Sequence, residues 1–182
     1  MQSTGSGRPS HPVYRSATTV GHSGPMPRQS AGILLYRFEP GGTCEVLIGH
    51  MGGPFWAKKD AGAWSIPKGE FELGEVPFDV ARREFAEELG SPVPAAEFLD
   101  LGGLRVTSGK VLHVWAAEGD LDARTCVSNT VELEWPPRSG LLQQFPEIDR
   151  AAWCSLAEAR EKLVTGQIGF LDRLQEHFPA PA

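Results

Sequence analysis

The sequence contains little cysteine, with three residues in 182. Cys44, Cys126 and Cys154 are odd in number, lie far apart and form no C-x-x-C pair. A disulfide framework needs an even number of cysteines at short, regular spacings. The three thiols therefore predict buried or idle cysteines in a reducing cytoplasm.

The chain also lacks long apolar runs and an excess of positive charge. No stretch approaches the ~20 apolar residues that cross a membrane, and none near the start resembles a signal peptide. We therefore expect a cytoplasmic protein without a membrane partner. The formal net charge of -6 argues against a nucleic-acid partner, because such proteins neutralise phosphates with lysine and arginine. The charge leaves a small anionic ligand open, because a bound divalent cation would reverse the local field.

What is present suits one soluble globular domain. Hydrophobic residues make up 41% of the chain and charged residues 22%, fractions that support an ordinary core. Residues 1–29 are rich in Gly, Ser, Pro and Thr and have no apolar periodicity, which predicts a disordered tail. Order is expected over 30–178, followed by a short tail at 179–182.

The ordered region mixes strands and helices. Apolar, β-prone runs predict strands at 31–38 and 44–49, joined as a hairpin through the Pro-Gly-Gly turn at 40–42. Further strands are expected at 98–106, 111–117, 130–135 and 151–154, and helices at 155–164 and 168–178. The pattern indicates one α/β domain without an internal repeat.

A further helix is expected at 77–89. Pro77 suits the first helical position, Asp79 places negative charge in the first turn, and Gly90 is a natural stop. At about 100° per residue, one side of this helix carries an apolar stripe. The stripe consists of Phe78, Ala81, Phe85 and Leu89. We expect it to face the core.

Glu84, Glu87 and Glu88 stand at i, i+3 and i+4, so they form a second face beside the apolar stripe. Like charges at these spacings repel each other. The alternative to a functional role is a solvated acidic face. A hard divalent cation, which prefers oxygen ligands, would offset the repulsion and favours a metal site.

The segment from Gly69 to Ser91 resembles the Nudix box, G-x5-E-x7-R-E-U-x-E-E-x-G-U with U apolar. The matching positions are Gly69, Glu75, Arg83, Glu84, Phe85, Glu87, Glu88 and Gly90. Ser91 departs from the pattern, because it occupies the final apolar position. The resemblance implies an α/β/α sandwich with a mixed central sheet, the box helix on one side and the C-terminal helices on the other.

The resemblance also implies a pyrophosphohydrolase that uses Mg²⁺ or Mn²⁺. The metal ligands would be the side chains of Glu84, Glu87 and Glu88 and the carbonyl of Gly69. One of these glutamates, or a glutamate from outside the box, would act as the base, with Glu84 the first and Glu87 the second choice. Arg83 would orient Glu84. By the same resemblance, Glu75 would brace the junction between loop and helix, and Glu70 would be an extra ligand.

Nudix enzymes often recruit a further carboxylate from outside the box. Glu132 and Glu134 lie on the polar face of the strand expected at 130–135 and are the first candidates, with Glu147 a weaker third. A solvated strand face is the alternative explanation for Glu132 and Glu134.

The substrate is expected to be a nucleotide. Phe55, Trp56 and Lys58 lie in a loop that offers a stacking surface and positive charge, or else aromatic side chains that cap the core. Trp64 and Lys68 lead directly into the box and complete the candidate substrate site.

The stretch W-x-x-P-K-G resembles the approach to the box in asymmetric diadenosine tetraphosphate hydrolases, and also small predicted NTP pyrophosphohydrolases. A dinucleoside polyphosphate such as diadenosine tetraphosphate is therefore the first expectation. NTPs and ADP-ribose are the alternatives, as is a non-catalytic Nudix-fold ligand sensor. The sequence does not indicate an oligomeric state.

Overall fold

The computed structural model describes residues 26–178. Most of the tail expected at 1–29, and the tail expected at 179–182, lie outside the described residues. The first strand begins at Arg28, so the ordered domain starts two residues before its expected boundary.

A mixed central sheet organises the described part of the chain, 26–178. Its strands are β1 (Arg28–Phe38), β2 (Cys44–Met51), β3 (Trp64–Ser65), β4 (Lys68–Phe71), β5 (Leu99–Thr107), β6 (Lys110–Glu118) and β9 (Ile148–Ser155). The main path runs β3-β2-β1-β6-β5, while β4 pairs with β1 and β9 pairs with β2. β1 and β6 are parallel and the other pairs are antiparallel. The expected β1–β2 hairpin is confirmed.

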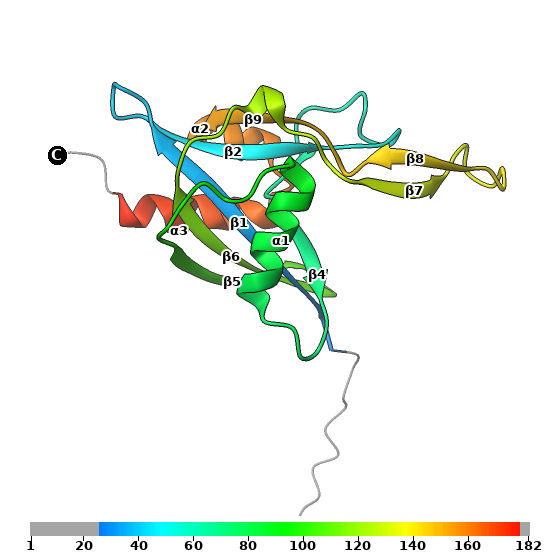
Figure 1. Cartoon of the computed structure of the whole chain (residues 1–182), viewed down its shortest axis with the longest axis horizontal. Coiled ribbons are helices and arrows are strands. Elements are labelled where there is room, and N and C mark those ends of the chain that lie inside the picture. Colours follow the sequence, from blue (N-terminus) through cyan, green and yellow to red (C-terminus); the bar gives the residue numbers. More distant parts are fainter. Residues whose placement is uncertain (1–25, 179–182) are drawn as a thin grey trace, which may run out of the picture.

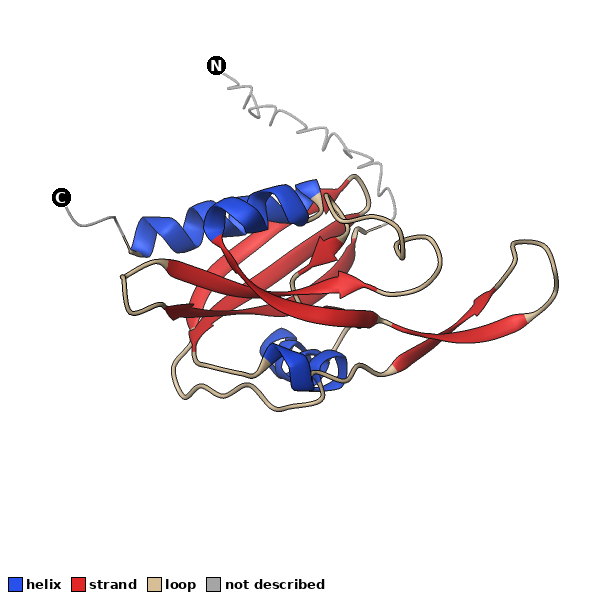
Figure 2. Ribbon diagram, turned by 90° about the horizontal axis from the view of Figure 1, so that it is seen from above, coloured by secondary structure: helices blue, strands red, loops and turns tan. Residues whose placement is uncertain are grey.

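Helices cover both faces of this sheet. α1 (Pro77–Leu89) lies on one face, and α2 (Leu156–Lys162) and α3 (Ile168–His177) lie on the other (Figures 1 and 2). Two short 3-10 turns, η1 (Ala123–Thr125) and η2 (Thr165–Gln167), complete the described helical elements. This arrangement confirms the expected α/β/α sandwich. No helix within 26–178 has the length and apolar character needed to cross a membrane.

The sheet separates two hydrophobic cores, because alternate residues of a strand point to opposite faces. On β1, Ile33 and Leu35 pack with the α1 side, whereas Leu34 and Tyr36 pack with the α2 and α3 side. Both faces of β1 are therefore buried, which explains why its sequence is continuously apolar rather than alternating. The three cysteines, all within the described residues, are free thiols.

The local sequence sets the ends of α1. Pro77 stands in the first turn, and Gly90 ends the helix with a left-handed φ of 72° while its N–H donates to the Ala86 carbonyl. Its buried side contains Val80, Ala81, Phe85 and Leu89, and also one carboxylate, Glu88. A carboxylate on the core side of a helix is costly unless something compensates its charge.

The strand expected at 130–135 exists as β7 (Thr130–Glu134), but it does not join the central sheet. It pairs with β8 (Leu142–Pro146), a strand that was not expected, in a separate two-stranded ribbon. We call residues 130–146 the arm. It extends from one end of the molecule (Figure 1). A backbone hydrogen bond from Gly52 N to the Glu147 carbonyl at 2.8 Å joins the end of the arm to the body, and one from Glu147 N to the Asn129 carbonyl at 3.1 Å closes its base.

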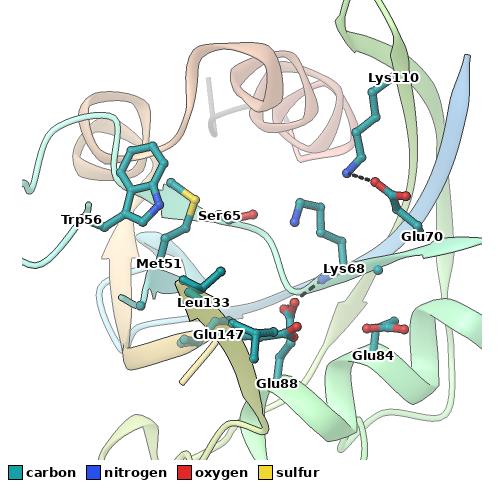
Figure 3. Close-up of a pocket in the computed structure, with 14 residues that line it drawn as sticks. Met51, Trp56, Ser65, Lys68, Glu70, Glu84, Glu88, Lys110, Leu133 and Glu147 are labelled. Carbon is teal, nitrogen blue, oxygen red and sulfur yellow. Dashed lines mark hydrogen bonds and ion pairs between the residues drawn. The ribbon is translucent and has the colours of Figure 1, made fainter. Parts of the chain in front are cut away.

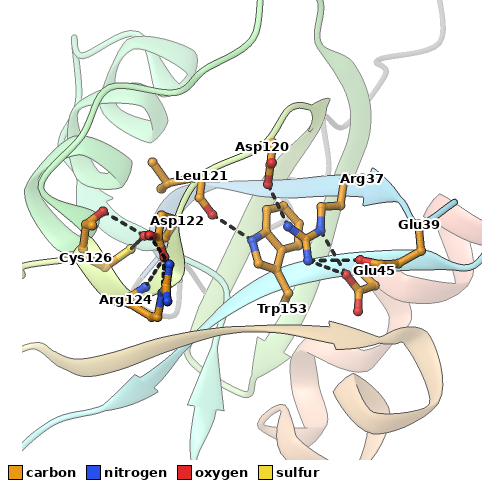
Figure 4. Close-up of polar contacts among 10 residues, drawn as sticks. Arg37, Glu39, Glu45, Asp120, Leu121, Asp122, Arg124, Cys126 and Trp153 are labelled. Atoms are coloured by element: carbon orange, nitrogen blue, oxygen red, sulfur yellow. Dashed lines mark hydrogen bonds and ion pairs between the residues drawn. The ribbon is translucent and has the colours of Figure 1, made fainter.

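A polar cluster braces β1 against its neighbours. The Arg37 guanidinium donates to Glu45 at 2.9 Å and to Asp120 at 2.8 Å, and it lies 4.3 Å from the ring centre of Trp153. Trp153 in turn donates its indole N–H to the Leu121 carbonyl at 2.8 Å (Figure 4). The cluster satisfies its own charges and holds the segment after β6 against β9.

Candidate active site

A cavity of about 500 Å³ opens between α1, β4 and the arm. Its lining is drawn in Figure 3 and consists of Met51, Gly52, Trp56, Ser65, Lys68, Gly69, Glu70, Glu84, Glu88, Lys110, Val131, Leu133, Glu147 and Ile148. These residues come from segments far apart in the sequence. Carboxylates, lysines and apolar side chains therefore meet in one place.

Two glutamates of the box, Glu84 and Glu88, are one helical turn apart and both line the cavity. Glu88 is only 7% exposed, and its Oε2 accepts the Lys68 backbone N–H at 3.0 Å. Burial raises the pKa of Glu88 from 4.5 to about 8; Lys68 opposes this shift, and Glu147 and Glu84 add to it.

Glu84 is also perturbed. Burial raises the pKa of its carboxyl above the usual range, and an ion pair with Arg83 opposes the shift. The negative charges of Glu87 and Glu147 raise it further. Two neighbouring carboxylates with raised pKa values indicate that the cavity holds too little positive charge for them.

Arg83 links two residues of the box. It donates to Glu75 Oε1 at 3.2 Å and to Glu84 Oε1 at 3.3 Å, while Glu75 also accepts the Glu72 backbone N–H at 2.8 Å. That backbone hydrogen bond, followed by the Arg83 contact, lowers the pKa of Glu75. The loop before the helix is thus tied to the helix face that carries Glu84. Glu87 is exposed, lies 3.9 Å from Arg83, and is not part of the cavity lining.

Gly69 allows the backbone of β4 to lie directly against a carboxylate. A Cβ at this position would be 2.0 Å from the carboxyl carbon of Glu84 and 2.3 Å from its Oε2. Any side chain at Gly69 would therefore displace Glu84. The structure gives a steric reason for glycine at the start of the box.

Lys68 and Lys110 bring positive charge to the cavity, above the α1 carboxylates in the view of Figure 3. Lys110 Nζ pairs with Glu70 at 2.9 Å, and Arg28 contacts the same carboxylate at 3.2 Å. The hydrogen bond from Lys110 lowers the pKa of Glu70. Glu70 lines the cavity but is already neutralised by these cations.

The structure places the first candidates for the extra carboxylate away from the cavity. Glu132 and Glu134 are exposed on β7 and do not line the cavity; Glu134 instead accepts the Gly140 backbone N–H at 2.8 Å. The neighbouring Val131 and Leu133 face the cavity, because side chains alternate along a strand. Glu147, the weaker candidate, lines the cavity and influences the pKa of both α1 carboxylates.

The aromatic candidates separate into different environments. Trp56 lines the cavity, whereas the side chain of Phe55 packs edge-on against Trp135 of the arm with ring centres 5.2 Å apart. Trp64 is 3% exposed, belongs to the core and donates to Asp60 at 2.9 Å. Lys58 is exposed and is not among the lining residues. Only Trp56 of these four is placed to contact a ligand there.

The cavity lining also includes residues for which the sequence predicted no role, among them Met51, Lys110, Val131 and Leu133. Each has an ordinary local sequence environment: two are the apolar half of an alternating strand, and Lys110 follows a Ser-Gly turn. Nothing within their own segments marks them as site residues, because they acquire a role only through strand pairing and the position of the arm.

The cavity fits a hard divalent cation by the chemistry of its donors. Within residues 26–178, no group of three or more His, Cys, Asp or Glu side chains is already arranged around one point as a ligand set. Glu84 and Glu88 are nevertheless paired at the α1 wall with raised pKa values. A divalent cation would supply the missing positive charge, and carboxylate and carbonyl oxygens are its preferred ligands.

The family is shown by comparison with known domains. A family model of the NUDIX domain matches residues 26–174. The chain therefore belongs to the NUDIX domain family, as the resemblance at its box implied, and it is a hydrolase that acts on phosphoric anhydrides.

Solved structures share its fold. An Ap4A hydrolase of C. elegans, solved as a binary complex, is 20% identical with a TM-score of 0.52, covering 82% of this chain and 96% of that one. The NUDIX domain of Shewanella oneidensis NrtR, solved with ADP ribose, is 15% identical with a TM-score of 0.55, covering 82% and 86%. The M. smegmatis Nudix hydrolase RenU is 22% identical with a TM-score of 0.52, covering 85% and 89%. At these identities the likeness concerns the fold.

Proposed function

We propose that the protein is an Mg²⁺- or Mn²⁺-dependent pyrophosphohydrolase that cleaves a nucleoside diphosphate linked to another group. A dinucleoside polyphosphate such as diadenosine tetraphosphate is the proposed substrate. The observation that carries this proposal is the cavity itself. The buried Glu88 and the half-buried Glu84 of α1, two lysines and an aromatic side chain line the same space of about 500 Å³.

In this proposal Glu84, Glu88 and the Gly69 carbonyl hold the metal. Glu87 lies near enough to Glu84 to raise its pKa and is the proposed third ligand from the helix. The chemistry that a bound Mg²⁺ or Mn²⁺ ion supplies is neutralisation of phosphate oxygens and acidification of water. Glu147 is the proposed carboxylate from outside the box.

The protein side chains divide the remaining tasks. Glu84 is the first candidate for the base that takes the proton from the attacking water, with Glu87 the second, and Arg83 holds Glu84 in place through its contact of 3.3 Å. Lys68 is proposed to bind a phosphate oxygen, since its side chain lines the cavity beside Glu88. Positive charge favours the ionised form of Glu88, so a cation bound at this wall would hold its carboxyl in the charged state that a metal ligand needs.

The substrate class rests on the two kinds of surface in the cavity. Trp56 offers a flat apolar face on which a base can stack, a contact typically worth ~1–3 kcal/mol. The lysines suit a chain of phosphates. Of the similar structures, one is an Ap4A hydrolase and another binds ADP ribose, so ADP-ribose and NTPs are the competing substrates in the test.

The test is a steady-state comparison of diadenosine tetraphosphate, ATP, ADP-ribose and an NDP-sugar with Mg²⁺ or Mn²⁺, with products identified. We expect diadenosine tetraphosphate to give ATP and AMP with the highest kcat/KM. Glu84→Gln tests whether turnover comes from this site: it should lower turnover about 100-fold or more while the protein remains folded. A higher kcat/KM for ADP-ribose would overturn the substrate assignment, and metal-independent turnover would overturn the mechanism.

A further inference from the structure

The arm forms one wall of the cavity. Val131 and Leu133 of β7 face inward and line it. Leu142 of β8, which pairs with Glu134 of β7, is 64% exposed. The arm has little core of its own, since it is a two-stranded ribbon outside the central sheet. Its inner apolar side chains, Val131 and Leu133, are half-buried and face the cavity.

Contacts with the loop after β2 fix the position of this wall. Phe55 meets Trp135 edge-on at 5.2 Å, a favourable aromatic geometry. Gly53 lies against the arm, so that a Cβ there would be 3.5 Å from Leu133 Cδ1. The same loop carries Trp56 into the cavity. The loop and the arm are thus joined, and each contributes one cavity wall.

The cavity has an apolar end and a charged end. Figure 3 shows Trp56, Met51 and Leu133 together at one end, and Glu84 and the Lys110–Glu70 pair at the other. A nucleotide has the same asymmetry, with a flat, largely apolar base at one end and anionic phosphates at the other. Placing the phosphates beside the α1 carboxylates, where the metal is proposed to bind, leaves the base at the apolar end.

We propose that the arm is the second wall of a nucleobase subsite, in which Leu133 packs on the base opposite the surface formed by Trp56 and Met51. The Phe55–Trp135 contact positions this wall. The inference deepens the proposed function and rests on it for the orientation of the nucleotide. It assigns base binding to β7, a strand that the box does not include.

The first experiment compares Leu133→Ala with Leu142→Ala, a matched control on the exposed side of the same ribbon. Hydrolysis of diadenosine tetraphosphate and equilibrium binding of AMP and of inorganic pyrophosphate are measured for both. Leu133→Ala should raise KM and weaken AMP binding about 10-fold, because apolar contact with the base is lost, with kcat within about 2-fold. Pyrophosphate binding should not change, and Leu142→Ala should match the wild type.

The second experiment concerns the aromatic contact. Trp135→Ala should raise KM as Leu133→Ala does, by releasing the arm from the loop. Trp135→Phe keeps an edge-to-face partner for Phe55 and should restore most of the affinity. Equal KM values for Trp135→Ala and the wild type would show that this contact does not position the wall.

The outcomes separate this inference from the proposed function. Wild-type turnover of diadenosine tetraphosphate with unchanged KM and AMP affinity in Leu133→Ala would overturn the subsite and leave the hydrolase assignment intact. Absence of turnover together with AMP binding that depends on Leu133 would overturn the substrate assignment and support the subsite. Equal losses of AMP and pyrophosphate binding would indicate a general structural effect and would also overturn the subsite.

Discussion

Replacing Glu88 by glutamine should make the metal-free protein more stable. Glu88 is 7% exposed, and its Oε2 accepts the backbone N–H of Lys68. Glutamine has nearly the same shape, and its carbonyl oxygen can accept the same hydrogen bond without carrying a charge. The substitution therefore removes a buried charge while keeping the packing of α1.

The size of the effect follows from the pKa shift. Burial raises the pKa of Glu88 from 4.5 to about 8 in the folded protein, so the folded state binds this proton more tightly than the unfolded chain. The contribution of Glu88 to the free energy of unfolding is fully present below about pH 4.5 and is lost as the pH rises through the folded-state pKa of about 8. The loss should be about 3 kcal/mol at pH 7 and about 5 kcal/mol well above pH 8, at 1.36 kcal/mol per pKa unit.

The assay is urea unfolding in EDTA at several pH values. Glu88→Gln should match the wild type near pH 4 and exceed its free energy of unfolding by about 3 kcal/mol at pH 7. Added Mg²⁺ should stabilise the wild type and have much less effect on the variant, because a ligand is lost. Glu87→Gln, on the exposed side of the same helix, is the control and should show no such gain. Equal stability of wild type and Glu88→Gln at pH 9 would refute the reasoning.

Three further predictions concern turnover. Gly69→Ala should lower kcat at least about 10-fold, because the added Cβ would lie 2.0 Å from the carboxyl carbon of Glu84 and would displace this carboxylate. A normal kcat would show that the Glu84 carboxylate can move without loss of function. Arg83→Ala should lower kcat about 10- to 100-fold with little change in urea stability, measured on the same preparation, since an exposed ion pair adds little to stability. Glu147→Ala should lower kcat strongly, whereas Glu132→Ala should retain the wild-type rate; the reverse order would restore the β7 carboxylate as the one near the metal.

The box helix illustrates how far local sequence reaches. Pro77 and Gly90 fix the ends of α1, because helix termini depend on neighbours within a few residues. The stripe expected at helical spacing is buried at Ala81, Phe85 and Leu89, whereas its first member, Phe78, is half-buried. The apolar runs on either side of the Pro-Gly-Gly turn also predicted the β1–β2 hairpin, and the helix expected at 155–164 begins with a capping box in which Ser155 and Glu158 exchange hydrogen bonds. Each of these features is set by short-range hydrogen bonding and side-chain spacing.

The arm illustrates what local sequence could not supply. The alternation at 130–134 predicted a strand correctly, but β8 was missed because Gln143 and Gln144 are polar and Pro146 suggests a strand end. Without a partner strand, the pattern could not say which face met the cavity. Glu132 and Glu134 were consequently preferred, although Val131 and Leu133 face inward.

The sequence by itself determined the family, the box helix and the residue types of the site, because fixed spacings on one helix are independent of the rest of the fold. The tertiary structure decided which of those residues share a cavity. The rotation of α1 against the sheet buries Glu88 and leaves Glu87 exposed, although the two are adjacent in the chain. Burial then raises the pKa of Glu88. This burial depends on side chains from segments that are distant in the sequence, and no local pattern encodes it.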